Sequence, residues 1–379
     1  MSNSGKKLYR QVYSDENLTE AWHKVKSNSD AAGVDGVTVA QFQRYLFSNL
    51  KALQRDLQKR SYRPQPVKRI HISKPDGSKR PLGILTVRDR IVQRAVLNVI
   101  EPLFEADFEA TSYAFRPGRS VEMALEEVAR LVNQGYSWVV DLDIEDFFES
   151  INLERLYSFI AKKVKDRELR RIIRRWLEVE TVSIEKNGLF RKERSRGLLQ
   201  GGVISPLFAN IYLDRFDKQA RKKGLKVVRY ADDILILCRT EREARKGLKI
   251  ARKLLAKLDL ELNPQKTRIL HVEQGLRFLG ETLLPKKGEA GEHLVWIGDS
   301  TDTDQLRRPQ RININAGDGG VNDGLEESIP IPIELLDELE PGPELEPEEE
   351  EEGKGVKEGK ERGDGQPLHH RAGRYPGED

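Results

Sequence analysis

Two adjacent carboxylates, Asp232 and Asp233, stand at the tip of a predicted β-hairpin. They lie between the apolar runs 227–228 and 234–237, and two short apolar runs that meet at a turn predict a hairpin buried on both faces. Burying two carboxylates costs several kcal/mol unless cations compensate for the lost hydration. Divalent metal ions would compensate, and two metals about 4 Å apart are a common means of phosphoryl transfer. Taken alone, the pair could instead be a solvated turn.

A third carboxylate is needed to hold two metals, and a second predicted strand supplies candidates. Residues 139–144 predict a buried strand that places Asp141 and Asp143 on one face. One of the two could be structural, but solvation of both is disfavoured among so many apolar neighbours. Ile144 would offer its backbone carbonyl to the second metal.

Three further segments carry features that suit phosphate groups. The glycine-rich loop 200–206 runs into an apolar helix at 207–213; glycines permit close backbone approach, and a helix start favours negative charge. Lys74 and Arg80 bracket a turn and would clamp phosphates as a basic hairpin. The basic turn 115–120 is another candidate for phosphate contact. Each segment taken alone could be an ordinary connection or a charged hairpin.

Length and composition limit the class of protein. At 379 residues the chain can form two or three domains with a large core. Its single cysteine, Cys238, excludes an internal disulfide framework and suits a reducing cytoplasm. The sequence contains no run of about 18 apolar residues, and its first residues lack the apolar core of a signal peptide. We therefore expect a cytoplasmic protein without membrane contact.

The net charge of +3 conceals two oppositely charged regions. Residues 286–379 carry 11 Lys+Arg and 25 Asp+Glu, which leaves 54 basic and 37 acidic residues, a net of +17, on residues 1–285. A body with this excess attracts polyanions, and nucleic acid is the usual partner. Residues 317–379 are rich in Gly, Pro and Glu and would bury too little apolar surface to offset their ordering entropy. The sequence predicts a disordered, acidic tail or linker there.

The remaining patterns predict alternating helices and strands. Residues 1–60 are amphipathic and helical, broken by a turn at 33–36, while strand signals surround a turn within 67–85. Apolar residues at helical spacing predict helices at 88–103, 153–164, 167–178 and 241–258. We divide the chain into a helical extension at 1–62, a central region at 63–285, a connecting segment at 286–316 and the acidic tail at 317–379.

These elements, in this order, resemble the bacterial group II intron-like reverse transcriptases. The resemblance covers about residues 20–285, and so many ordered motifs leave little room for coincidence. The motifs that carry it are Gly33–Gly36, Arg80–Ile84, Asp89–Gln93, Phe115–Ser120, Asp143–Phe148, Gln200–Pro206, Tyr230–Asp233, Asn263–Thr267 and Phe278–Gly280. The resemblance implies an α+β right-hand polymerase with fingers and palm, in which helices back an antiparallel palm sheet. The implied reaction is RNA-directed DNA synthesis from a primer 3′-hydroxyl and dNTPs.

The resemblance also assigns a role to individual residues. Asp143, Asp232 and Asp233 would bind two Mg²⁺ ions, with Mn²⁺ as a substitute and the Ile144 carbonyl as a further ligand, while Asp141 matches no catalytic position. Phe148 would block a ribose 2′-hydroxyl, and Lys266 would donate a proton to pyrophosphate. The other assigned residues are Lys74 and Arg80 for the triphosphate, Gln200 and Gly201 for the nucleotide pocket and template, and Phe278, Leu279 and Gly280 for the primer grip.

Within this lineage, residues 116–124 and 135–141 look most like those of the CRISPR-associated reverse transcriptases. Such enzymes are frequently joined to, or encoded beside, the spacer integrase, and an acidic linker would suit that arrangement. The expected partners are therefore an RNA template, a primer strand, dNTPs and the CRISPR spacer integrase. Two alternatives remain open. One is an intron-encoded protein without its maturase and endonuclease regions; the other is a non-catalytic RNA-binding defence component.

Overall fold

The computed structural model describes residues 5–27, 31–73, 77, 79–184, 190–194, 197–287 and 293–299. Lys74 and the predicted acidic tail at 317–379 lie outside these residues. Within them the chain forms helices and three β-sheets, which confirms the predicted α+β class. No helix in the described part of the chain is both long and apolar enough to cross a membrane.

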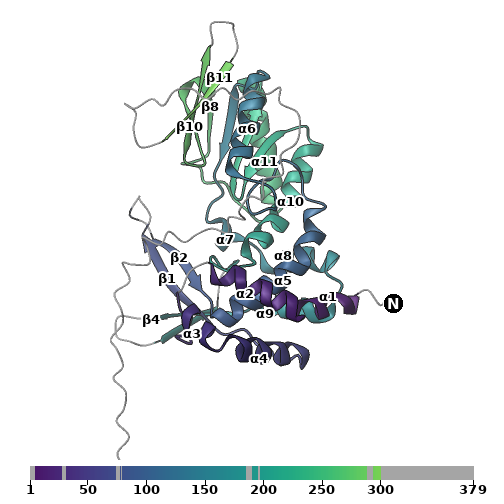
Figure 1. Ribbon diagram of the computed structural model, residues 1–379. Helices are drawn as coiled ribbons and strands as arrows, with labels where there is room; N and C mark the ends of the chain where they lie inside the picture. Colours follow the sequence, from purple (N-terminus) through teal and green to yellow (C-terminus); the bar gives the residue numbers. More distant parts are fainter. Residues whose placement is uncertain are drawn as a thin grey trace, which may run out of the picture. The chain divides into compact units, whose positions relative to one another are not determined.

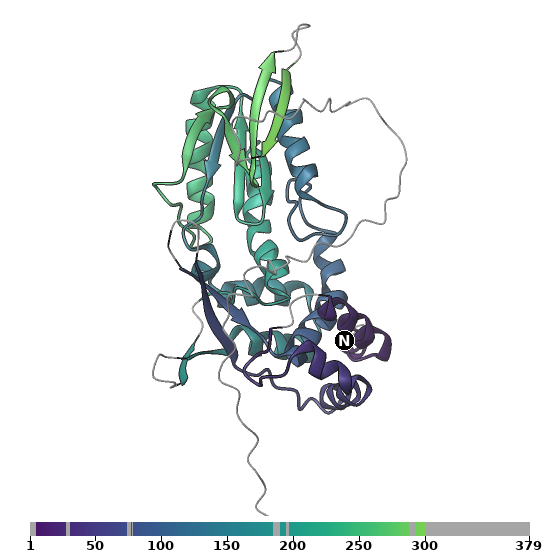
Figure 2. The same ribbon diagram turned by 60° about the vertical axis from the view of Figure 1, so that its left-hand side comes forward.

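The N-terminal helices are those that the amphipathic pattern predicts. They are α1 (Gly5–Val12), α2 (Asp15–Lys26), α3 (Val39–Arg44) and α4 (Leu46–Gln58). Ser14 caps α2 by accepting a hydrogen bond from the Asn17 backbone, which satisfies one free N–H of the first turn. The Asn17 side chain in turn donates to the Ala95 carbonyl of α5 (Val87–Glu105), at 2.9 Å. The purple N-terminal helices thus pack beside α5 and share its core (Figure 2).

The first sheet has the strand order β2-β1-β4-β5 and belongs to the predicted fingers. Its strands are β1 (Val67–Ser73), β2 (Lys79–Ile84), β4 (Glu180–Ile184) and β5 (Phe190–Arg194). β1 and β2 are antiparallel, as the sequence predicts, and Ile72 pairs with Arg80. The sequence analysis did not foresee β4 and β5; β4 joins β1 in parallel through Val67 and Thr181. The predicted helices α8 (Leu153–Lys163) and α9 (Arg167–Leu177) lie between the two hairpins in the chain.

The palm sheet has the strand order β6-β7-β3-β8 and is antiparallel throughout. Its strands are β6 (Lys226–Tyr230), β7 (Asp233–Cys238), β3 (Trp138–Leu142) and β8 (Arg268–His271). Helices α10 (Ser205–Lys222) and α11 (Glu241–Ala256) pack on one face, and α6 (Val121–Asn133) packs on the other (Figure 1). Alternate residues therefore enter different cores: Val140 and Ile236 pack with α10 and α11, whereas Val139 and Leu235 pack with α6. This two-sided burial confirms the predicted hairpin and the helix-backed palm.

A third sheet follows the palm and extends beyond the predicted pattern. Its strands, in the order β11-β10-β9, are β9 (Leu276–Phe278), β10 (Glu281–Lys287) and β11 (His293–Asp299), preceded by a short 3₁₀ helix, Val272–Gln274. We expected the regular pattern to end at Pro285, but Pro285 lies inside β10 and pairs with Val295. Leu276, Phe278 and Leu283 are buried in the same core as α6. This sheet therefore packs on the α6 side of the palm.

Candidate active site

The turn between β6 and β7 carries the two adjacent aspartates. Tyr230 pairs with Asp233, so Ala231 and Asp232 form a two-residue turn. Ala231 has φ 56°, in the left-handed region that costs a non-glycine residue about 1 kcal/mol. Directly behind the turn, Ile234 is fully buried. The tip is therefore anchored in the core, with Asp233 exposed and Asp232 half-buried.

Asp143 lies at the end of β3, beside this turn. Leu142 pairs with Ile234, and continuing the antiparallel register by one residue brings Asp143 opposite Asp233. The predicted strand over 139–144 is two residues too long, because β3 ends at Leu142. The register thus brings two of the three predicted catalytic carboxylates together.

A loop after α11 holds the backbone at Asp143. The Asn263 N–H donates to the Asp143 carbonyl at 2.9 Å, and the Glu145 N–H donates to the Glu261 carbonyl at 2.9 Å. Ile144 itself forms an antiparallel bridge with Leu262. Since the two hydrogen bonds come from the neighbours of Ile144, its own carbonyl points away from this loop. That carbonyl is the group that the sequence analysis offered to a metal.

Desolvation and neighbouring carboxylates raise the pKa of the two turn aspartates. Desolvation, and then repulsion by Asp232, raises the pKa of Asp233 to about 6. Asp141 and Asp143 add to this repulsion. Desolvation also raises the pKa of Asp232. The charge of Arg80 opposes this rise, and the charge of Asp143 adds to it. The carboxylates therefore concentrate negative charge at the turn, and the positive charge of Arg80 compensates for it only in part.

Basic side chains approach the carboxylates from two elements. Nζ of Lys266 lies 3.8 Å from Oδ2 of Asp143, and the Asn263 side chain fixes the turn by accepting the backbone N–H groups of Gln265 and Lys266. Arg80, exposed on β2 of the fingers, partly offsets the rise in the pKa of both turn aspartates. Its predicted companion Lys74 lies outside the described residues.

Asp141 differs from the other aspartates in having a firm partner. Its carboxylate accepts a hydrogen bond from Nε of Arg268 at 3.0 Å, and the two residues face one another across β3 and β8. Desolvation raises the pKa of Asp141, and Arg268 opposes that rise. An aspartate bound in this way is suited to holding the sheet rather than an ion.

The residues at the turn fit a divalent cation of the hard, oxygen-binding kind. Mg²⁺ prefers carboxylates and usually keeps several waters and substrate phosphates, so it needs only one or two protein carboxylates. In the described residues no group of three or more His, Cys, Asp or Glu side chains is arranged so that it could hold a metal ion by itself. The three aspartates instead form an open, mutually repelling set. Their shared negative charge is what a bound cation would neutralise.

The glycine-rich loop lies against the fingers. The Gly83 N–H of β2 donates to the Gln200 carbonyl at 2.8 Å. At Gly201, where φ is 96°, a Cβ would come within 2.5 Å of the Gly83 carbonyl oxygen, so only glycine fits. Gln200 is half-buried, and Gly201 is exposed. This loop therefore connects the palm directly to strand β2.

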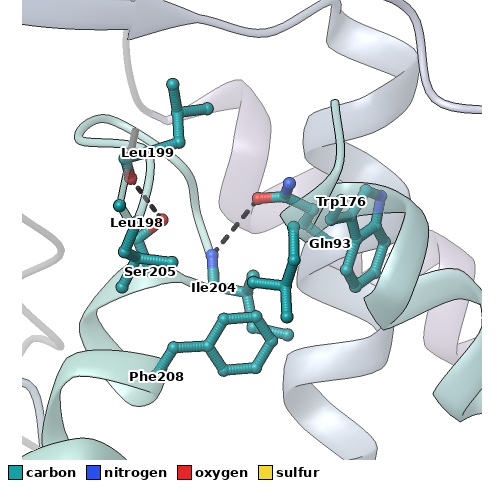
Figure 3. A pocket seen from close by; sticks show the side chains of 9 residues that line it. Gln93, Trp176, Leu198, Leu199, Ile204, Ser205 and Phe208 are labelled. Atoms are coloured by element: carbon teal, nitrogen blue, oxygen red, sulfur yellow. Dashed lines mark hydrogen bonds between the residues drawn. The ribbon is translucent and has the colours of Figure 1, made fainter. Parts of the chain in front are cut away.

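A small cavity of about 20 Å³ lies behind the same loop, beside α5 and α10 (Figure 3). Figure 3 shows the Gln93 side chain accepting a hydrogen bond from the Ile204 backbone, and Ser205 Oγ donating to the Leu199 carbonyl. A cavity of this size holds about one water molecule. The residues that line the cavity hold the loop in place, and the cavity itself is too small for a nucleotide.

Phe147 and Phe148 begin the short helix α7 (Phe147–Ser150) and have different surroundings. Phe147 is 3% exposed and belongs to the main core, whereas Phe148 is only half-buried. The two rings meet edge to face, with centroids 5.3 Å apart. The Phe148 carbonyl accepts the Leu198 N–H at 2.7 Å, which places this residue beside the glycine-rich loop.

The predicted primer grip is a tight hairpin. Phe278 pairs with Glu281, so Leu279 and Gly280 form the turn between β9 and β10. Both have positive φ, 54° and 85°, as a type I′ turn requires. Phe278 is 5% exposed and packs in the core, so only the Leu279–Gly280 tip is open to a ligand.

Arg116 does not take the role that the basic turn 115–120 suggested. Its side chain is 4% exposed and binds the Glu105 carboxylate of α5, at 2.6 Å for the shortest contact. The same guanidinium donates to the carbonyls of Glu109 and Ser112, both at 2.7 Å. Arg116 is therefore committed to structure and is unsuited to binding a phosphate, while Arg119 stays accessible beside the Tyr113 ring.

A buried polar cluster that the sequence did not predict lies behind the Ala231–Asp232 turn. Arg229, fully buried on β6, pairs with the fully buried Asp217 of α10 at 2.6 Å. The guanidinium also donates to Asn210 Oδ1 and to the Ala231 carbonyl, each at 2.9 Å. The signal available in the sequence was a lone arginine directly before the turn, following two buried valines.

Comparison with known proteins identifies the family of this chain. The family described as reverse transcriptase (RNA-dependent DNA polymerase) matches residues 72–283. Protein YkfC of Escherichia coli (strain K12) is 34% identical over 330 residues, which cover 76% of this chain and 86% of YkfC. The group II intron-encoded protein LtrA of Lactococcus lactis is 30% identical over 340 residues, 72% of this chain and 56% of LtrA.

A solved structure of a Cas6-RT-Cas1–Cas2 complex is also similar, at 25% identity and a TM-score of 0.41. The match covers 66% of this chain and 41% of the chain in that complex. This chain therefore spans about half the length of LtrA and less than half of the matched chain in the complex.

The chain belongs to the reverse transcriptase family. The matched family is described as RNA-dependent DNA polymerases, and the relatives that the chain resembles include a group II intron-encoded protein.

Proposed function

We propose that this protein extends a primer 3′-hydroxyl with dNTPs along an RNA template, with two divalent ions held by Asp143, Asp232 and Asp233. Mg²⁺ is the proposed ion, and Mn²⁺ would substitute for it. The observation that carries the proposal is the register between β3 and β7, which brings Asp143 opposite Asp233 at the tip of a rigid hairpin. Two bound ions would lower the barrier to attack by the hydroxyl and to departure of pyrophosphate.

The protein's own side chains would then bind and orient the reactants. Arg80 faces the aspartates from β2 and would bind the negatively charged triphosphate. The half-buried Phe148 ring would lie under the sugar and exclude a 2′-hydroxyl. Lys266, beside Asp143, would give its proton to the departing pyrophosphate.

Gln200 and Gly201 would line the nucleotide pocket, since their loop is joined to β2. The tip formed by the half-buried Leu279 and the exposed Gly280 would support the primer end. Contacts to the template would mainly involve phosphates and sugars, because base pairing supplies the sequence information.

Primer extension tests this proposal. The full chain is supplied with an RNA template, a DNA primer, dNTPs and Mg²⁺, and is compared with a folded Asp232→Asn variant. We expect extension by the parent, none after chelation of Mg²⁺, and RNA binding in both proteins. A parent that binds RNA with no extension in Mg²⁺ or Mn²⁺ would instead identify a non-catalytic RNA-binding component.

For the biological setting, we propose a CRISPR-associated enzyme that makes cDNA for spacer acquisition from RNA, acting with the spacer integrase. The supporting observations are the segments 116–124 and 135–141 and the acidic segment 317–379, whose composition suits a linker. The second candidate is an intron-encoded reverse transcriptase without maturase and endonuclease regions, which the 30% identity with LtrA favours.

The two settings differ in the nucleic acid on which the enzyme acts. In a spacer-acquisition assay, the chain together with the integrase encoded beside it should yield new spacers that match a transcribed RNA, and Asp232→Asn should abolish them. Specific binding of a structured intron RNA, together with intron boundaries around the gene and no RNA-derived spacers, would favour the intron candidate.

A further inference from the structure

The buried cluster behind the catalytic turn is built around a single guanidinium. Nε and Nη2 of Arg229 both bind the Asp217 carboxylate, at 2.9 and 2.6 Å, and neither side chain is exposed. Such a two-point contact fixes the plane of the guanidinium as well as its position. Asp217 lies on α10, so the pair joins β6 to the helix that packs against the palm sheet.

The third nitrogen of Arg229 reaches the turn itself. Nη1 donates to the Ala231 carbonyl at 2.9 Å and to Asn210 Oδ1 at 2.9 Å. Asn210, also on α10, is held in place by donating to the Ala114 carbonyl at 2.8 Å. The peptide carbonyl that directly precedes Asp232 is therefore fixed by a side chain that is itself fixed from both sides.

This arrangement does more than fill the core. A well-packed apolar pair would serve as well for stability, because desolvating two charges offsets most of their attraction. The guanidinium instead bonds a turn residue in the unfavourable left-handed conformation, where Ala231 has φ 56°. Without that bond, the Ala231–Asp232 peptide would have other orientations available.

We propose that Arg229 is a positioning residue, which orients the Asp232 carboxylate toward Asp143 by holding the Ala231 carbonyl. Asp217 and Asn210 set the guanidinium for this task. The inference rests on the proposed function, because it concerns the carboxylates that would hold the metal ions.

Arg229→Lys tests the proposal in the full chain. The variant keeps the charge, but a single ammonium cannot bind Asp217 at two points and also reach the Ala231 carbonyl. We expect the rate of single-nucleotide addition to fall about 10²-fold, as misplacement of a reacting group by an ångström can do. Primer–template affinity should remain within about twofold, because Arg229 is buried and contacts no ligand surface.

A second readout is independent of catalysis. Binding of Mn²⁺ to the free protein, followed by electron paramagnetic resonance, should weaken about tenfold in Arg229→Lys, as it does when groups that orient metal ligands are lost. Tyr62→Phe is the matched control, because it removes another buried hydrogen bond, to Asp89 at 2.6 Å, in the fingers. It should lower the melting temperature with the addition rate and Mn²⁺ affinity unchanged.

A folded Arg229→Lys protein with the parental rate and Mn²⁺ affinity would overturn the proposal and leave the cluster a purely structural role. Should that variant not fold, Asn210→Ala takes its place. We expect a smaller loss of both the addition rate and the Mn²⁺ affinity, and parental values of both would again overturn the proposal. A parent without polymerase activity would refute the proposed function, while the Mn²⁺ comparison would still decide the positioning role.

Discussion

Lys266 Nζ and Asp143 Oδ2 lie 3.8 Å apart, across a loop whose turn is fixed by Asn263. Lys266 is largely exposed, with 60% of its side-chain surface open to solvent. An exposed ion pair of this kind adds little to stability. Its position beside a proposed catalytic carboxylate is therefore better explained by chemistry than by support of the fold.

Replacing Lys266 should slow the chemical step. Both Lys266→Ala and Lys266→Arg should lower the single-turnover rate about 10²-fold, because arginine keeps the charge but cannot give up a proton. Rapid-quench measurement of one nucleotide addition checks this, with Lys253→Ala, exposed on α11, as the control. A parental rate in Lys266→Arg would show that only the positive charge matters.

Asp143 and Asp141 should respond very differently to the same change. Asp143→Asn should lower the extension rate about 10³-fold or more, since a metal ligand contributes several kcal/mol to the transition state. Asp141→Asn, which weakens the pair with Arg268, should change the rate less than about tenfold, as expected for an exposed salt bridge. Primer extension with purified, folded variants provides the comparison. Equal losses in the two variants would contradict the assignment.

Phe148 should control the choice of sugar. Phe148→Ala removes the ring proposed to exclude a 2′-hydroxyl, so the ratio of ribonucleotide to deoxyribonucleotide incorporation should rise at least about tenfold. The comparison uses kcat/KM for matched rNTP and dNTP substrates. Phe147→Leu is the control, because Phe147 is buried in the core and its loss should reduce stability instead. A changed ratio only in the Phe147 variant would show that the two roles are exchanged.

Asp233 should make the metal-free protein less stable at neutral pH. Its pKa is about 6 when folded against a usual 3.8, so the folded state binds the extra proton, and stability falls as pH rises from about 4 through 6. Asp233→Asn should therefore raise the melting temperature at pH 7.5, and the difference should shrink toward pH 4.

Addition of Mg²⁺ provides the internal check on this pH effect. Mg²⁺ should stabilise the parent more than Asp233→Asn, because an ion that binds the folded state shifts unfolding by mass action. Glu126→Gln, an exposed carboxylate on α6, should show neither effect. A lower melting temperature for Asp233→Asn at pH 7.5 would contradict the predicted repulsion.

Local patterns in the sequence were sufficient for most of the palm. The apolar runs beside Asp232 and Asp233 and the run before Asp143 predict buried strands because neighbouring side chains alternate between two cores. The hairpin register followed from the two-residue turn. The end of β3 could not be predicted, because the loop that bonds the backbone after Leu142, at Glu261 and Asn263, is more than a hundred residues away in the chain.

Features that depend on distant partners escaped prediction. From the sequence, Arg116 is a candidate for phosphate binding; only the structure shows that it pairs with Glu105 of α5. The sequence does not distinguish Arg229 from other basic residues; only the structure shows that it is bound by Asp217 and Asn210. Strand β4 requires its parallel partner β1, and parallel pairing over a long separation leaves no turn signal in the sequence.

The contact between Gly83 and Gln200 joins the base of strand β2 to the palm loop. At this seam a Cβ on Gly201 would collide with the Gly83 carbonyl, and one on Gly83 would come within 2.8 Å of the Leu199 side chain. The base of β2 and the palm loop are therefore held together by a hydrogen bond between their backbones and by close packing. A methyl group added at Gly201 would therefore force β2 and the palm loop apart, so a change in one element would be transmitted directly to the other.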